Sequence, residues 1–359
     1  MLKSKATESS QVFYEGNGRS ITLENYVSEE VIEFLSRIQF GYVGTLYEHK
    51  NTREIILRMT NPNVLVVRIN GQIAVTSLFS KRELKLNDKT YDAYYIRYLA
   101  ADEQFQGRGI VAKYGVISMN WMRKVQEKPT VFYNFVEEQN RSSYRLIEFV
   151  KFKQIGGVRT IGFSRVFPRS LGGLERIEDF DAYPEFKSSL AAYYQKYNVF
   201  NLFDVKYELP YYVYKINGEI VAGVQPHKAQ WVLNSLPGTL GKIALSVIPH
   251  MPYLKRIVNP KDFKFLGFEG FYFKPGHAQN LKRLLEGVLH DLKHYSALMW
   301  FDEKDPQLDA LLAKKDMGLV YHFAKSSNTK VMVSFKGFTD EEQALFKERS
   351  LYISALDNM

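Results

Sequence analysis

Two glycines, Gly107 and Gly109, lie two residues apart between a run typical of a β-strand and a run typical of an amphipathic helix. Residues 95–99 are mostly aromatic, β-branched or long, and residues 110–124 place apolar side chains at helical spacing. Glycine lets backbone N–H groups point outward together and lets a bulky anion approach closely. The helix N-terminus adds partial positive charge at the same place. The stretch therefore predicts a binding site for a pyrophosphate.

Two common nucleotide sites fit this stretch less well. A P-loop needs a Lys-Ser or Lys-Thr pair directly after the last glycine, where this chain has Ile110 and Val111. A dinucleotide-binding turn needs a third glycine, for which Ala112 could substitute, and an acidic residue at the end of a second strand about 20 residues later. Residues 121–126 still have a helical pattern at that distance, so neither nucleotide site is favoured.

The stretch resembles the acyl-CoA loop of the GNAT superfamily of N-acetyltransferases. The pattern of that loop is Gln/Arg-x-x-Gly-x-Gly/Ala, after the fourth strand and at the start of the third helix, and Gln106, Gly109 and Val111 occupy its marked positions. The resemblance implies acetyl-CoA as cosubstrate and direct transfer of the acetyl group to an amine. The residues that it assigns to acetyl-CoA here are Leu99, Ala100, Ala101, Gln106, Gly107, Arg108, Gly109, Ile110, Val111 and Ala112.

The next block of the sequence continues the resemblance. Residues 130–136 predict a strong strand, and a loop, a short helix and a Lys-Phe pair follow it. Asn140 takes the place of an asparagine that in the superfamily often contacts the pantetheine arm, and Ser143 takes the place of a small residue. Both are therefore expected to bind the cosubstrate. The resemblance covers roughly residues 15–167, which is a normal length for one domain.

Acetyl transfer to an amine also needs a proton acceptor for the amine and a proton donor for the leaving thiolate. Glu137 and Glu138 follow the predicted strand and are the candidates for the proton acceptor. Ile147 stands where many members of the superfamily carry a tyrosine that protonates the thiolate. Tyr144 lies three residues earlier on the same helical face, so it is the first candidate for the proton donor. A backbone N–H near Leu99 is expected to polarise the thioester carbonyl.

The chain also repeats one piece of itself. Residues 66–75 and 213–222 both contain Asn-Gly between apolar runs, a strong hairpin signal, and similar orders of strands and helices follow. The second copy has Pro275-Gly276 where the first has its glycine pair, and proline removes a backbone donor. The prediction is an α/β (α+β) protein with two GNAT-like domains, each a mixed, mostly antiparallel twisted sheet flanked by helices. Residues 1–168 would form the acetyltransferase domain and residues 169–359 a degenerate domain that shapes the acceptor pocket.

Composition limits the other possibilities. The 359 residues include no cysteine, which excludes disulfides and thiol nucleophiles, and the net charge of +9 comes without a dense basic tract. His290 and His294 have metal-ligand spacing but no His-Glu-x-x-His motif, so no metal is expected. No apolar run approaches the ~20 residues that span a bilayer, and the N-terminus lacks a signal-peptide pattern. We expect a soluble cytoplasmic protein that binds neither nucleic acid nor membrane.

Two questions stay open at this stage. The acceptor is a small-molecule or peptide amine, and an amino acid, a polyamine, an aminoglycoside-like molecule, a peptide N-terminus and a protein lysine all fit; a longer acyl group is also compatible. Val111, Ile147 and Lys151 depart from the superfamily pattern. These departures favour an alternative, a non-catalytic acyl-CoA-binding or ligand-sensing protein.

Overall fold

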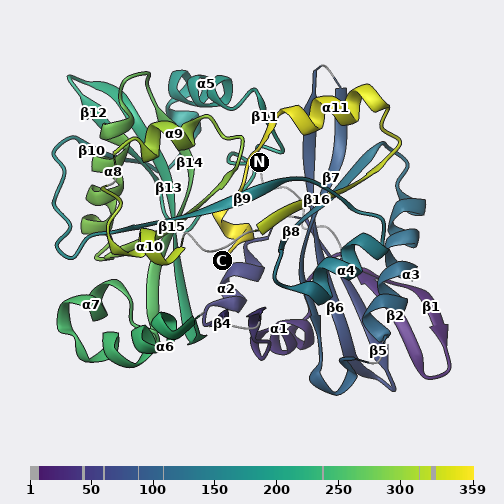
Figure 1. The fold of residues 1–359 in the computed structure, drawn as a ribbon. Helices are drawn as coiled ribbons and strands as arrows, with labels where there is room; N and C mark the ends of the chain where they lie inside the picture. The colour runs from purple at the N-terminus through teal and green to yellow at the C-terminus, as the bar shows by residue number, and fades with distance from the viewer. Residues whose placement is uncertain are drawn as a thin grey trace.

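The protein is a mixed α/β structure built on one large, mostly antiparallel sheet with helices on its faces (Figure 1). The computed structural model describes residues 8–42, 45–59, 61–87, 89–107, 109–236, 238–314, 316–324 and 329–359. Within these ranges the sheet has 15 strands, and its main path runs β1-β2-β5-β6-β7-β8-β16-β9-β15-β14-β13-β12-β10.

The strands of this sheet come from both halves of the chain. The first part of the path contains β1 (Ser10–Gly16), β2 (Arg19–Glu24), β5 (Pro62–Ile69), β6 (Gln72–Leu86), β7 (Lys89–Ala101), β8 (Thr130–Glu137) and β16 (Thr329–Lys336). The second part contains β9 (Lys153–Ser164), β15 (Ser296–Asp302), β14 (Phe263–Phe273), β13 (Glu219–Ser235), β12 (Tyr211–Ile216) and β10 (Leu174–Ile177). Off the path, β3 (Phe40–Tyr42) pairs with β4 (Thr45–His49), which pairs with β13; β11 (Tyr197–Asn198) and β17 (Ser350–Leu351) form a separate pair.

The two halves exchange a strand at the middle of the sheet. Strand β16 belongs to the second half of the chain and lies between β8 and β9, whereas β9 belongs to the first half and lies between β16 and β15. The two expected sheets therefore join into one, and strand pairing crosses residue 168. The division of the chain into domains at that residue stays a prediction.

Both copies of the repeated hairpin fold in the same way. Asn70 and Gly71 join β5 to β6 with φ of 50° and 82°, and Asn217 and Gly218 join β12 to β13 with φ of 51° and 83°. Two successive positive φ angles are typical of the tight turn whose twist matches a hairpin. Each hairpin is followed by a similar order of strands and helices, as the repeat predicts.

Helices lie on both faces of the sheet (Figure 1). Their bounds are α1 (Glu29–Ser36), α2 (Thr52–Leu57), α3 (Ile110–Val125), α4 (Arg141–Phe149), α5 (Pro184–Tyr193), α6 (Gly238–Val247), α7 (Pro252–Ile257), α8 (Ala278–Asp291), α9 (Gln307–Leu312), α10 (Leu319–Ala324) and α11 (Asp340–Glu348). Short 3₁₀ turns are η1 (Glu103–Phe105), η2 (Phe180–Ala182), η3 (Ile248–His250) and η4 (Ala355–Asp357). No helix within the described ranges is both long and apolar enough to cross a membrane.

Alternating side chains divide the core between the two faces of the sheet. On β5, Leu65 and Val67 face α3 and α4, whereas Val64 and Val66 face α1 and α2. A further buried cluster joins the halves, since Tyr95 of β7 and Tyr133 of β8 pack in the same core as Phe265 of β14. The space between the two halves is thus the place where side chains from both can meet.

Candidate active site

Strands β7 and β8 separate before they end. Their parallel pairing joins Asp92–Tyr95 to Thr130–Tyr133, and no described residue beyond Tyr95 continues it. Further along β7, the pairing with β6 shifts register next to Tyr98, whose φ is 51°, so that Tyr98 and Leu99 have no paired residue on β6. This is a β-bulge, a device that bends a strand and redirects a side chain. It opens the sheet between β7 and β8.

A cavity of about 410 Å³ lies at this opening. Four of the residues predicted from the sequence line it: Leu99, Glu137, Asn140 and Ser143. They come from the bulge, from the end of β8 and from the start of α4. The wall also includes Trp231 of β13, so both halves of the chain border the cavity.

Asn140 positions the helix that forms one side of the opening. Its Oδ1 accepts a hydrogen bond from the Ser143 N–H at 3.2 Å, which caps the first turn of α4. The cap fixes both residues at the cavity wall. Ile147, one turn later, also lines the cavity and is buried.

Glu137 is half-buried at the end of β8 and faces the cavity. Burial raises the pKa of its carboxyl to about 7, because a low-dielectric environment disfavours the charged form. A carboxylate with a pKa near neutrality is suited to accept a proton at physiological pH.

The other two predicted catalytic residues lie outside the cavity wall. Glu138 is exposed, and its carboxylate is 3.6 Å from the Lys330 ammonium. The Tyr144 hydroxyl donates to Gln154 Oε1 on β9 at 3.4 Å. Tyr144 and Ile147 are about 60° apart around the helix axis, and Ile147 lines the cavity whereas Tyr144 does not. The catalytic roles of Glu138 and Tyr144 stay predictions.

The glycine turn leads from β7 into α3. Gly107 and Gly109 have φ of 73° and 69°, and a Cβ on either would meet open space, so the backbone conformation is what requires glycine. Gln106 Nε2 donates to the Ala101 carbonyl at 3.0 Å and holds the turn closed. Gly109 is the N-cap of α3. Arg108 lies outside the described residues.

The remaining loop residues occupy the end of β7 and the first turn of α3. Ala100 is buried against the α1 and α2 side, and Ala101 ends the strand. Ile110, Val111 and Ala112 form the first turn of α3, where backbone N–H groups have no partner within the helix. These amides follow directly after the glycine turn.

A smaller cavity of about 60 Å³ lies between the sheet and helices α3 and α4. Ile96, Leu99 and Ile147 line both cavities, and Val111 lines the smaller one. The two cavities are therefore adjacent beside the bulge.

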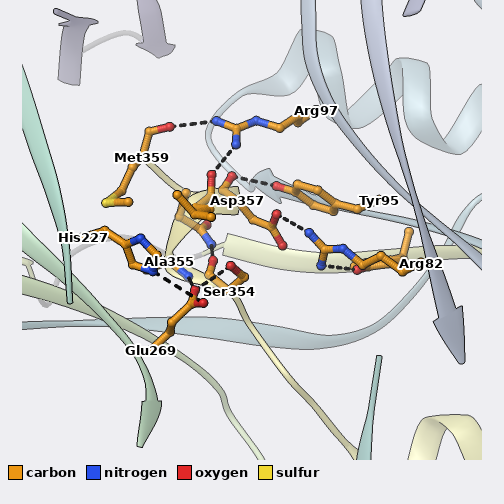
Figure 2. Close-up of polar contacts among 12 residues, drawn as sticks. Arg82, Tyr95, Arg97, His227, Glu269, Ser354, Ala355, Asp357 and Met359 are labelled. Atoms are coloured by element: carbon orange, nitrogen blue, oxygen red, sulfur yellow. Dashed lines mark hydrogen bonds and ion pairs between the residues drawn. The ribbon is translucent and has the colours of Figure 1, made fainter. Parts of the chain in front are cut away.

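The structure adds a chain segment that the sequence did not assign to the site. Residues 354–359 lie between the halves, where Arg97 Nη2 donates to the Met359 oxygen at 2.7 Å and Tyr95 donates to the Asp357 carbonyl at 3.0 Å (Figure 2). Arg82 forms an ion pair with the Asp357 carboxylate, and both side chains are buried. From the other half, Glu269 accepts a hydrogen bond from Ser354 at 2.5 Å.

Asp357 and its neighbour Asn358 line the larger cavity, as do His49 and Trp231. No local pattern marks these residues, since their partners lie far away in the sequence. The one signal is Arg97, the charged residue within residues 93–101 of β7. Within the described ranges, no group of three or more His, Cys, Asp or Glu side chains could hold a metal ion.

Comparison with known proteins identifies the fold. No family model and no curated protein matches the chain. The structure of Saccharomyces cerevisiae N-myristoyltransferase with bound myristoyl-CoA is similar, with a TM-score of 0.59, 10% identity, and coverage of 97% of this chain and 92% of that chain. A structure of that enzyme with myristoyl-CoA and inhibitors has a TM-score of 0.58, 10% identity, and coverage of 96% and 88%.

A GCN5-related N-acetyltransferase from Anabaena variabilis has a TM-score of 0.47 and 10% identity, with 87% of this chain and 72% of that chain covered. The chain has the expected GNAT-type fold, which it shares over nearly its whole length with the N-myristoyltransferase structures.

Proposed function

We propose that the protein transfers an acetyl group from acetyl-CoA directly to an amine, at the opening between β7 and β8. The observation that carries this proposal is the cavity at the bulge, where Leu99, Glu137, Asn140 and Ser143 meet. Their order matches what the transfer needs: a bulged backbone for the carbonyl, a capped helix beside the pantetheine arm, and a carboxylate for the amine proton.

Acetyl-CoA would bind with its pyrophosphate at the glycine turn and the first amides of α3. The open space around Gly107 and Gly109 supports this position. The Val111 side chain packs against the buried cluster beneath α3. Its size therefore does not obstruct the outer side of the turn.

In the reaction, the neutral amine attacks the thioester carbon, a C–N bond forms, and the C–S bond breaks with its electron pair leaving on sulfur. The backbone N–H of Leu99 stabilises the negative charge on the carbonyl oxygen. Glu137 takes the proton that the amine loses. Tyr144 is the proposed proton donor for the thiolate. To reach the sulfur, its side chain would turn away from Gln154, to which the hydroxyl donates.

We place the acyl group in the smaller cavity, next to Leu99, and the size of that cavity favours a short acyl group. One water needs about 10–15 Å³ of such space, so a cavity of about 60 Å³ has room for only a few heavy atoms. Both N-myristoyltransferase structures hold myristoyl-CoA, a much longer acyl group. Acetyl transfer is accordingly the proposal here.

The test is release of free CoA thiol from acetyl-CoA in the presence of a panel of primary amines. The proposal expects amine-dependent release, which Glu137→Gln should lower strongly. Glu138→Gln is the matched control, because that side chain lies outside the cavity wall. If no amine of a broad panel increases the release of CoA thiol above the level without amine, the proposal is contradicted.

Non-catalytic acyl-CoA binding is a second candidate function. The observation in its favour is that Ile147 takes the cavity position while the Tyr144 hydroxyl lies against Gln154. This candidate expects tight acetyl-CoA binding without thiol release for any amine.

A further inference from the structure

Aromatic rings form much of the wall of the larger cavity on the side that faces the second half of the chain. They include those of Phe40, Tyr47, Tyr95, Phe135, Trp231 and Trp300. Tyr47 stacks on Trp231 with ring centroids 4.5 Å apart, and Tyr95 lies 5.1 Å from Phe135. Such a wall favours a flat apolar group, because stacked and edge-on rings are the preferred partners of another ring.

Buried polar atoms without a partner interrupt this aromatic wall. Five side-chain atoms have no hydrogen-bond partner among the described residues: both ring nitrogens of His49, Asn134 Oδ1, Trp231 Nε1 and Asp357 Oδ2. His49, Asn134 and Asp357 are 8%, 5% and 8% exposed. Buried polar groups in folded proteins are normally hydrogen-bonded. Their convergence on one cavity indicates a ligand that supplies the missing partners.

The charges of the wall limit how many ammonium groups that ligand can carry. Among the described residues that line the cavity, Glu137 and Asp357 are the carboxylates and Arg97 is the arginine. Asp357 already has Arg82 as an ion-pair partner through Oδ1. His49 stays neutral, since burial and then the nearby Arg97 lower its pKa to about 3.

The wall can therefore offset one ammonium but not several. A second ammonium would lie in an aromatic cavity without a carboxylate and close to a guanidinium, and burying an unpaired charge is strongly unfavourable. Polyamines and aminoglycoside-like amines carry several ammonium groups, so they do not match the charges of the cavity wall.

We propose that the acceptor is an aromatic primary monoamine with one hydrogen-bonding substituent on its ring. The proposal rests on the acyl transfer proposed above and names its acceptor. The ring lies against the aromatic wall, the amine lies between Asp357 and Glu137, and the ring substituent bonds to Trp231 Nε1 and His49. One acetyl group passes to the amine nitrogen, and one proton passes to Glu137.

The test compares tyramine, phenethylamine and spermidine with the full chain. Calorimetry measures amine binding, and thiol release measures acetyl transfer. We expect tyramine to bind at least about fivefold more tightly than phenethylamine, which lacks the hydroxyl, and spermidine to bind weakest. Tighter binding of spermidine than of tyramine would overturn the proposed acceptor class.

Trp231→Phe keeps a ring and removes the indole N–H, so it should lower the preference for tyramine over phenethylamine about fivefold. Trp121→Phe is the matched control, because Trp121 stacks on Phe13 at 4.2 Å outside the cavity wall. An unchanged preference in Trp231→Phe would contradict the proposal. The binding measurement needs no turnover: tyramine binding without thiol release supports the acceptor site and contradicts the acetyl transfer.

Discussion

Tyr98 in β7 and Gly270 in β14 occupy equivalent places in the two halves, with φ of 51° and 60°. Each lies at a register shift just after the strand leaves its parallel neighbour. In the first half the opening is a cavity. In the second half it is filled: Leu202 packs within 2.9 Å of the position of a Cβ on Gly270, and Tyr211 and Tyr194 donate to the Gly270 and Phe271 carbonyls at 2.7 and 2.6 Å.

The strand-end acids differ in the same way. Glu137 at the end of β8 faces the cavity, and burial raises its pKa. Asp302 at the end of β15 accepts hydrogen bonds from the backbone N–H groups of Leu351 and Lys304, both at 2.9 Å. One bulge thus borders a cavity, whereas side chains of the core fill the space beside the other. The same backbone irregularity is available to a ligand only where no side chain fills it.

The largest effect on stability is expected from removing a side chain that packs beside the Gly270 bulge. Tyr194→Ala removes a buried ring and leaves the Phe271 carbonyl without its donor, which should cost about 3–5 kcal/mol of unfolding free energy. Tyr194→Phe removes the hydroxyl alone and should cost about 1–3 kcal/mol. Chemical denaturation measures both. If the account is right, the folded fraction of either variant keeps its acetyl-CoA affinity.

Removing the Glu137 carboxylate should lower the rate of acetyl transfer and should not lower the stability of the fold. Glu137→Gln is expected to lower kcat/KM about 10²–10⁴-fold, the usual contribution of a positioned base. In the unmodified protein kcat/KM should rise with pH through about 7, because the carboxyl must lose its proton before it can accept one. A pH profile that keeps this limb in Glu137→Gln would assign the titration to another group.

The same pKa predicts an opposite effect on stability. The folded pKa is raised from 4.5 to about 7, so Glu137 contributes stability below pH 4.5 that is lost as the pH rises through 7. Glu137→Gln should therefore unfold at a higher temperature than the unmodified protein at pH 8. Calorimetric unfolding at pH 5 and pH 8 checks the sign.

The smallest effect concerns the Lys-Phe pair after α4. Lys151 has φ of 67°, and the N–H of Phe152 bonds to the Ile147 carbonyl at 3.1 Å, which closes a helix end that normally takes glycine. Lys151→Gly should stabilise the protein by about 1 kcal/mol. Lys151→Ala, which keeps a Cβ, should not, and equal unfolding midpoints for the two variants would contradict this reason.

Local sequence patterns predicted the parts of the site that depend on one strand and the turn after it. Leu99 lies near the end of β7, and Asn140 and Ser143 lie where β8 leads into α4; the pairing of β7 with β8 brings them to one cavity. Their roles stay predictions. The orientation of Tyr144 was not predictable. Its spacing from Ile147 fixes the angle between the two side chains around the helix axis, but it does not fix which face of α4 borders the cavity. The two Asn-Gly hairpins were predictable for the same reason as the glycine turn: each depends on a pair of neighbouring residues.

Contacts between distant segments were beyond the sequence. Asp357 meets Arg82 across 275 residues, and the exchange of β9 and β16 joins strands from opposite halves. Side chains that close such long loops follow no periodic pattern, and one sequence does not reveal which distant segments pair. The pairing of β4 with β13, which are also far apart in the sequence, brings His49 and Trp231 together at the cavity.

Calorimetric titration with acetyl-CoA tests the central claim most directly. Gly109→Asp places a carboxylate in open space at the N-terminus of α3, at a φ that Asp and Asn tolerate better than most residues. Gly109→Asn gives nearly the same shape without the charge. The account predicts that the unmodified protein binds acetyl-CoA, that the Asp variant loses binding and that the Asn variant keeps most of it. Equal affinities in all three, or no binding by the unmodified protein, would contradict it.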